Sequence, residues 1–87
     1  MRDTETTPEE RVEALVRFVA SSLVDNPDTL TVDVTSDDQS IRALIQAEPD
    51  DVGKIIGRGG RTIKSIRTLA RASVGTPALH VDIDVEG

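Results

Sequence analysis

Apolar residues recur at two different spacings along the chain, and the changes in spacing divide it into predicted helices and strands. From residue 8 to residue 23 they recur every three or four positions, which is typical of a helix with one buried face. The sequence TPEE at residues 7–10 supplies an N-cap, a proline at the first helical position and the glutamate of a capping box. Asn26 and Pro27 should end the helix, because a residue before proline avoids the helical conformation. The expected buried face comprises Val12, Leu15, Val16, Val19 and Leu23.

A period of two replaces the helical spacing over residues 30–35 and 41–47, where apolar residues face one way and the opposite positions are polar except for Leu44. This period predicts two strands with one packed face and one face in water. The polar connection SDDQS at residues 36–40 is short, so the two strands should form an antiparallel hairpin. A third alternating segment, residues 79–85, predicts the last strand.

Two further helices, separated by a glycine-rich turn, are expected between the second and third strands. The shorter one should cover about residues 52–56 with Asp50 or Asp51 as its N-cap, and Gly53 is expected to allow close helix packing. The longer one should run over residues 61–73 and end at Gly75. Its apolar side comprises Ile63, Ile66, Leu69, Ala70 and Val74. The order α-β-β-α-α-β predicts an α+β fold in which helices pack on one face of a three-stranded sheet.

Composition and length favour a small soluble domain. The chain has 87 residues, of which 37% are hydrophobic and 30% charged, and it contains no cysteine. We expect a flexible tail over residues 1–6 and a single domain over residues 7–87. No apolar run approaches membrane-spanning length and the N-terminus lacks the character of a signal peptide, so the expected location is the cytoplasm, without membrane contact.

Positive charge is concentrated in one segment of an acidic chain. The net charge is -6, yet residues 52–81 carry six cations and no acid. The overall charge argues against indiscriminate binding of polyanions, whereas the local segment can still bind one. On charge alone, a solvated basic face that balances an acidic surface is an equally good interpretation. The six cations are Lys54, Arg58, Arg61, Lys64, Arg67 and Arg71.

Three phosphate-binding motifs compete for the glycine turn within this segment. A P-loop requires Gly-Lys-Ser or Gly-Lys-Thr, and neither sequence occurs. A dinucleotide fingerprint would place its last glycine at Thr62, and it would need a strand where this chain predicts a helix. The remaining motif, the GXXG loop that clamps a nucleic-acid backbone, matches residues 57–60 between two helices.

The residues around this loop resemble a known family. The pattern I-I-G-x-x-G-x-x-I at residues 55–63 resembles the KH signature, and the order of elements is similar to the type II, bacterial KH arrangement. The phrase LVDNPD at residues 23–28 and the chain length resemble the KhpA family of small single-domain bacterial KH proteins. The resemblance covers roughly residues 9–85. It implies single-stranded RNA or DNA held in a narrow groove, with phosphates gripped by the turn and bases supported by aliphatic side chains.

The resemblance also assigns roles to individual positions. The implied clamp consists of Gly57, Arg58, Gly59 and Gly60. The implied nearby phosphate contacts are Lys54, Arg61 and Lys64, and the implied apolar groove wall is formed by Ile55 and Ile56. Many relatives carry a longer side chain at position 59, and glycine there makes the loop more mobile. The presence of only one aromatic residue, Phe18, agrees with aliphatic rather than aromatic support of bases.

Three classes of function follow from these features. The resemblance implies a broad-specificity RNA-binding regulator or RNA chaperone, with a second KH protein, KhpB, or another copy of the chain as a partner. The alternative is a protein-interaction module that keeps the KH shape and binds RNA weakly, which the acid-rich remainder and Gly59 favour. An enzyme is the weakest hypothesis, because one histidine, no cysteine and no nucleophile with an evident base leave little from which to build an active site. No cofactor or metal is expected.

Overall fold

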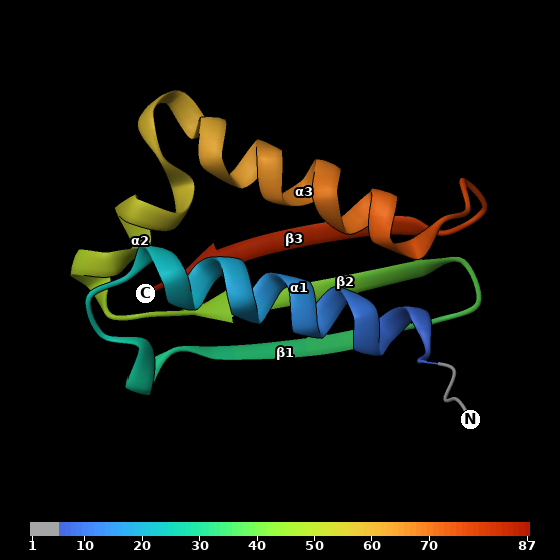
Figure 1. The fold of residues 1–87 in the computed structure, drawn as a ribbon, viewed down its shortest axis with the longest axis horizontal. Coiled ribbons are helices and arrows are strands. Elements are labelled where there is room, and N and C mark those ends of the chain that lie inside the picture. The colour runs from blue at the N-terminus through green and yellow to red at the C-terminus, as the bar shows by residue number, and fades with distance from the viewer. Residues whose placement is uncertain (1–5) are drawn as a thin grey trace.

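The computed structural model describes residues 6–87, so the predicted tail lies outside the described residues except for Thr6 (Figure 1). The predicted α-β-β-α-α-β order and α+β class are confirmed, and this order matches a type II KH fold. Two single 3₁₀ turns, Pro27–Thr29 and Arg58–Gly60, lie between the main elements. Those elements are α1 (Pro8–Leu23), β1 (Thr31–Ser36), β2 (Ser40–Gln46), α2 (Pro49–Ile56), α3 (Arg61–Val74) and β3 (His80–Glu86).

The three strands form one mixed sheet in the order β1-β2-β3. The predicted hairpin is confirmed, because β1 and β2 pair antiparallel. Its connection is closed by one Asp37 carboxylate oxygen, which accepts from the backbone N–H groups of Gln39 at 2.8 Å and Ser40 at 2.9 Å. β3 pairs parallel with β2, and this pairing requires the long crossover that α2 and α3 provide.

Both long helices cover the same face of the sheet, as predicted (Figure 1). The core lies between this helical layer and the inward-facing residues of the strands, while the opposite face of the sheet remains open to water. Arg11 joins the two helices, because its Nε donates to the backbone oxygen of Ser73 at 3.1 Å. The buried core comprises Val12, Val16, Ala20, Leu30, Val32, Ile41, Ala43, Ile45, Ile55, Ile63, Ile66, Ala70, Val74, Val81 and Ile83.

The helical spacing predicted the position of the buried face better than its width. The capping box at Thr7 and Glu10 is present, with both reciprocal hydrogen bonds formed. However, Leu23 and Leu69 are exposed rather than buried, which corrects the prediction. Leu69 lies about 100° around α3 from buried Ala70. The period of a helix gives the direction of its buried face, but not how much of the helix surface the packed elements cover.

The beginning of α2 also differs from the prediction. α2 starts at Pro49 with Glu48 as its N-cap, so neither Asp50 nor Asp51 has the capping role. Proline is favoured at the first helical position, so α2 begins at Pro49, three residues before the predicted start. Gly53 faces open space, with nothing within 4 Å of the position of a Cβ, so it does not serve close packing.

Within residues 6–87, no helix is long and apolar enough to cross a membrane.

Candidate nucleic-acid interface

The turn between α2 and α3 is built from three glycines with positive φ. Gly57 has φ 76° and ψ 173°, Gly59 has φ 64°, and Gly60 has φ 77°. Gly57 is the most restricted, because a Cβ there would clash with the Oγ1 of Thr62 and lie 2.7 Å from its Cβ. A Cβ on Gly59 or Gly60 would meet nothing within 4 Å. The chain can therefore make this tight turn only with glycine at position 57.

The backbone of the turn leaves hydrogen-bond donors free. The N–H of Gly57 donates to the oxygen of Gly53 at 2.8 Å and ends α2, while the N–H of Gly60 donates to the oxygen of Gly57 at 3.1 Å. The N–H groups of Arg58 and Gly59 make no backbone hydrogen bond within the part of the chain that the structure describes. Adjacent free N–H groups at the start of a helix can donate to the oxygens of a phosphate.

Four cations are predicted to contact phosphate, and three of them form no ion pair with another described residue. Arg58, Arg61 and Lys64 are exposed, and none of them forms an ion pair among residues 6–87. The structure thus places three exposed cationic residues in the turn and in the first turn of α3. Such an arrangement attracts the phosphates of a nucleic acid.

Lys54 is placed differently from the other predicted contacts. Its Nζ lies 2.7 Å from Asp25 Oδ2 and 3.1 Å from Asp51 Oδ1. Hydrogen bonds to Asp25 and then Asp51 raise the pKa of the Lys54 ammonium above its ordinary value. The positive charge of Lys54 is therefore engaged within the protein.

Of the two predicted wall residues, only one reaches the surface. Ile55 is fully buried in the core. Ile56 is half-buried and packs against the edge of that core. Ile55 therefore supports α2 from beneath, and Ile56 is the residue of the pair that can contact a ligand.

The basic segment continues along the side of α3 that faces β3. Arg67 donates from Nε and Nη2 to the backbone oxygen of Ile83, at 3.2 Å and 3.1 Å, and so binds an edge strand of the sheet. Arg71, one turn further along, is exposed. Arg67 therefore has a structural role that its position in a basic stripe did not indicate.

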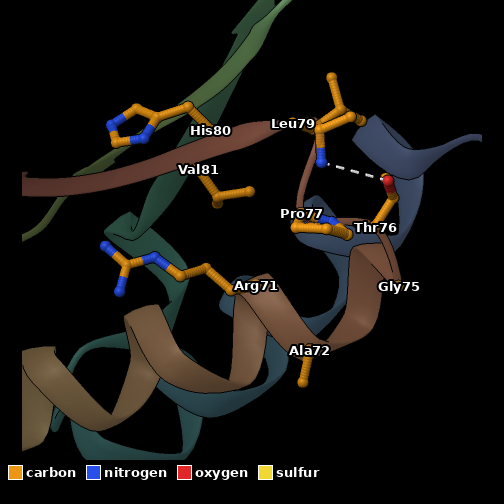
Figure 2. Close-up of a pocket in the computed structure, with 9 residues that line it drawn as sticks. Arg71, Ala72, Gly75, Thr76, Pro77, Leu79, His80 and Val81 are labelled. Carbon is orange, nitrogen blue, oxygen red and sulfur yellow. Dashed lines mark hydrogen bonds between the residues drawn. The ribbon is translucent and has the colours of Figure 1, made fainter.

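A hollow of about 590 Å³ lies at the far end of α3 from the glycine turn. It is formed by the end of α3, the loop that follows it and the start of β3, and Figure 2 shows the side chains of Arg71 and His80 extending on the same side of it. His80 Nε2 lies 3.3 Å from Asp82 Oδ1. Sequence patterns missed this hollow because a loop conformation has no period; the only local signal was the Gly75-Thr76-Pro77 stop after the helix.

A family model described as KhpA/KhpB, KH domain matches residues 13–85. The chain belongs to this family. Several proteins named RNA-binding protein KhpA are similar to this KH chain over most of its length. The protein from Caldanaerobacter subterraneus subsp. tengcongensis is 44% identical, over 82% of this chain and 95% of the relative. The protein from Mycobacterium tuberculosis strain H37Rv is 43% identical, over 83% of this chain and 84% of the relative. The protein from Oceanobacillus iheyensis is 36% identical, over 83% of this chain and 99% of the relative.

Solved structures with the same fold include two of the protein Era. An Aquifex aeolicus Era variant bound to GDP and AlF4⁻ superposes with a TM-score of 0.66 and 22% identity over 95% of this KH chain and 33% of the Era chain. Era in complex with MgGDPNP and nucleotides 1506–1542 of 16S ribosomal RNA superposes with a TM-score of 0.63 and 22% identity, over 99% of this KH chain and 37% of the Era chain. The KH chain thus spans about a third of the Era chains, and at this identity the likeness establishes the fold alone.

Proposed function

We propose that this chain is a non-enzymatic RNA-binding protein of the cytoplasm that holds single-stranded RNA at the Gly57–Gly60 turn. The observation that carries the proposal is the combination, within residues 6–87, of N–H groups at Arg58 and Gly59 without a backbone hydrogen bond and three neighbouring exposed cations without an ion pair. The relatives named RNA-binding protein KhpA support the same function. In this proposal the turn binds phosphates and not bases, so binding has low sequence specificity.

The path of the RNA follows α3 from the turn toward the hollow beside β3. Ile56 supplies apolar surface beside the turn, and Arg71 and His80 supply polar groups at the far end. With Phe18 on α1 as the only aromatic residue, bases must pack on aliphatic side chains. This chemistry suits a regulator or RNA chaperone of broad specificity, which binds many strands briefly.

Fluorescence anisotropy with a labelled, mixed-sequence single-stranded RNA of about 10 nucleotides tests the proposal. The variant R58D/G59D places two carboxylates in the turn; position 59 has open space, and aspartate tolerates its positive φ. The control A14D/R17D makes the same change in net charge on the exposed face of α1. Wild type should bind with a slope of log K against log salt of roughly -2 to -3, as expected for three or four phosphates.

The expected result is that R58D/G59D loses salt-sensitive binding while A14D/R17D keeps most of it. Circular dichroism on all three proteins verifies that they fold. Equal binding by wild type and R58D/G59D would move the site away from the turn. Absence of binding by wild type at low salt would overturn RNA binding altogether.

A protein partner is part of the proposal, in addition to RNA. The family name pairs KhpA with KhpB, which supports a KhpB-like protein as one candidate, and a second copy of the chain is the other. Two large apolar side chains of the helical layer, Phe18 and Leu69, are 71% and 49% exposed. Contact with a partner would remove this apolar surface from water.

A further inference from the structure

The ion pair between Lys54 and Asp25 lies beside the proposed phosphate clamp. Lys54 is on α2, three residues before Gly57, and Asp25 follows α1 in the loop that leads to β1. The end of α1 reaches the start of α2 in Figure 1, so this loop and the glycine turn flank the same short helix. The ammonium of Lys54 is 2.7 Å from Asp25 and 3.1 Å from Asp51.

The two carboxylates that bind Lys54 differ in burial and in their other hydrogen-bond partners. Asp51 is fully buried, and its oxygens also accept from the backbone N–H groups of Asp25 and Asn26 and from the side-chain amide of Asn26. Asp51 therefore fastens the loop to α2. The Asp25 side chain is 77% exposed, and within residues 6–87 Lys54 is its only polar contact. The fold does not depend on the Asp25 carboxylate, because an exposed ion pair of this kind contributes little stability.

The carboxylate of Asp25 acts against phosphate binding in two ways. It occupies the Lys54 ammonium, which would otherwise have one exposed side available to a phosphate oxygen. It also makes the local sum of the three charges negative, because Asp25 and Asp51 together outnumber Lys54. Without Asp25, Lys54 and Asp51 would neutralise each other and the ammonium would keep donor capacity to spare, since a lysine has three N–H bonds.

We propose that Asp25 is an affinity-determining residue that competes with RNA phosphate for Lys54 and so weakens RNA binding at the neighbouring turn. This inference rests on the proposed function. An approaching phosphate takes the place of the Asp25 carboxylate, and Asp25 returns to Lys54 when RNA leaves. A protein of broad specificity releases its RNA more readily with such an internal competitor.

The variant D25N tests this competition, because asparagine has nearly the same shape and no charge. At low salt D25N should bind the single-stranded RNA about fivefold more tightly than wild type. Its slope of log K against log salt should become steeper by roughly 0.7, the contribution of one additional phosphate. The thermal midpoint of D25N should stay close to that of wild type.

The matched control is D28N, which removes the same charge from an exposed residue of the same loop that does not contact Lys54. D28N should leave the affinity within about twofold of wild type. A second comparison uses K54M, which keeps the apolar stem of the side chain and removes the charge. In the K54M background, adding D25N should have no more effect than D28N has in wild type, because the competed group is gone.

Each outcome distinguishes this inference from the function on which it rests. Equal gains from D25N and D28N, no gain from D25N, or a full gain from D25N in the K54M background would overturn the competition while RNA binding at the turn stands. A wild-type protein and a D25N variant that both fail to bind RNA at low salt would overturn both proposals. A gain confined to D25N and dependent on Lys54 would support both.

Discussion

Neighbouring glycines between residues 53 and 60 have unequal importance for the turn. Gly57 combines a positive φ with Thr62 pressed against it, whereas Gly53 lies in a regular helix and faces open space. Gly59 and Gly60 need their positive φ but have room for a side chain. The sequence predicted the turn, but it did not distinguish these positions, because a glycine looks the same in every conformation. Thr62, which makes Gly57 obligatory, gave no signal beyond its place after the loop.

Replacement of Gly57 by alanine should destabilise the domain by at least about 2 kcal/mol, because it adds backbone strain and a clash with Thr62. The thermal midpoint should fall by roughly 10 °C in a domain of this size. G53A is the matched control on α2 and should raise stability by about 0.5 to 1 kcal/mol, since alanine favours a helix. Thermal unfolding followed by circular dichroism measures both. A G57A variant as stable as wild type would contradict the assigned role of Gly57.

At the scale of elements, periodic patterns predicted the two long helices and the three strands, while contacts between elements stayed hidden. Alternation located the strands and the hairpin because each has one packed face. The role of Asp51 could not be predicted, because its main donors come from a loop 25 residues earlier in the chain. An aspartate near the start of a helix suggests a cap, and only the folded chain shows that its carboxylate is buried against that loop. The ion pairs of Lys54 could not be predicted for the same reason, because one of its two partners, Asp25, lies in that distant loop.

The link between α2 and this loop should fail in acid. Burial alone would raise the pKa of Asp51, but hydrogen bonds from Asp25, Lys54 and Asn26 outweigh it and lower the pKa from 3.8 to about 2. The stability that ionised Asp51 contributes is therefore fully present well above pH 3.8 and is lost as the pH falls toward 2.

Urea unfolding of wild type and D51N across this pH range measures the effect of Asp51. Their difference in free energy of unfolding should be largest at neutral pH and should shrink between about pH 4 and pH 2. Glu9 and Asp37 also have lowered pKa values, from hydrogen bonds with Ser36 and with Gln39 and Ser40, and they titrate equally in both proteins. A difference independent of pH would show that the charge of Asp51 does not hold the loop.

At the scale of the whole molecule, the KH family and its type II order could be predicted because the glycine motif, the basic segment and the order of elements all agree. The arrangement of surfaces could not. The chain keeps three exposed cations, which form no ion pair among the described residues, at one end of α3, a hollow at the other end and exposed apolar residues on the same helical layer. Which side chains reach the surface depends on how two helices pack, and single residues such as Leu69 do not reveal this in a sequence.

If two copies pair through this apolar surface, L69D should shift the molecular mass from that of a dimer to that of one chain. A charge at an apolar interface costs far more than the same charge in water. T68D is the control, because Thr68 is an exposed neighbour on α3 and receives the same charge. Multi-angle light scattering over a range of protein concentrations measures the mass. A wild-type mass of one chain at every concentration would contradict the homodimer and leave the KhpB-like partner as the candidate.

The parallel pairing of β2 with β3 has a consequence for protein synthesis. Residue 40 lies opposite residue 80, so a ribosome needs roughly 2 to 8 s to add β3 after the start of β2. The β1–β2 hairpin can form in microseconds, and the glycine turn is made before β3 exists. Arg67 has no strand to bind during that interval, and the hollow at the end of α3 lacks a wall. The surface along α3 is therefore completed only when the last strand of the domain has been added to the chain.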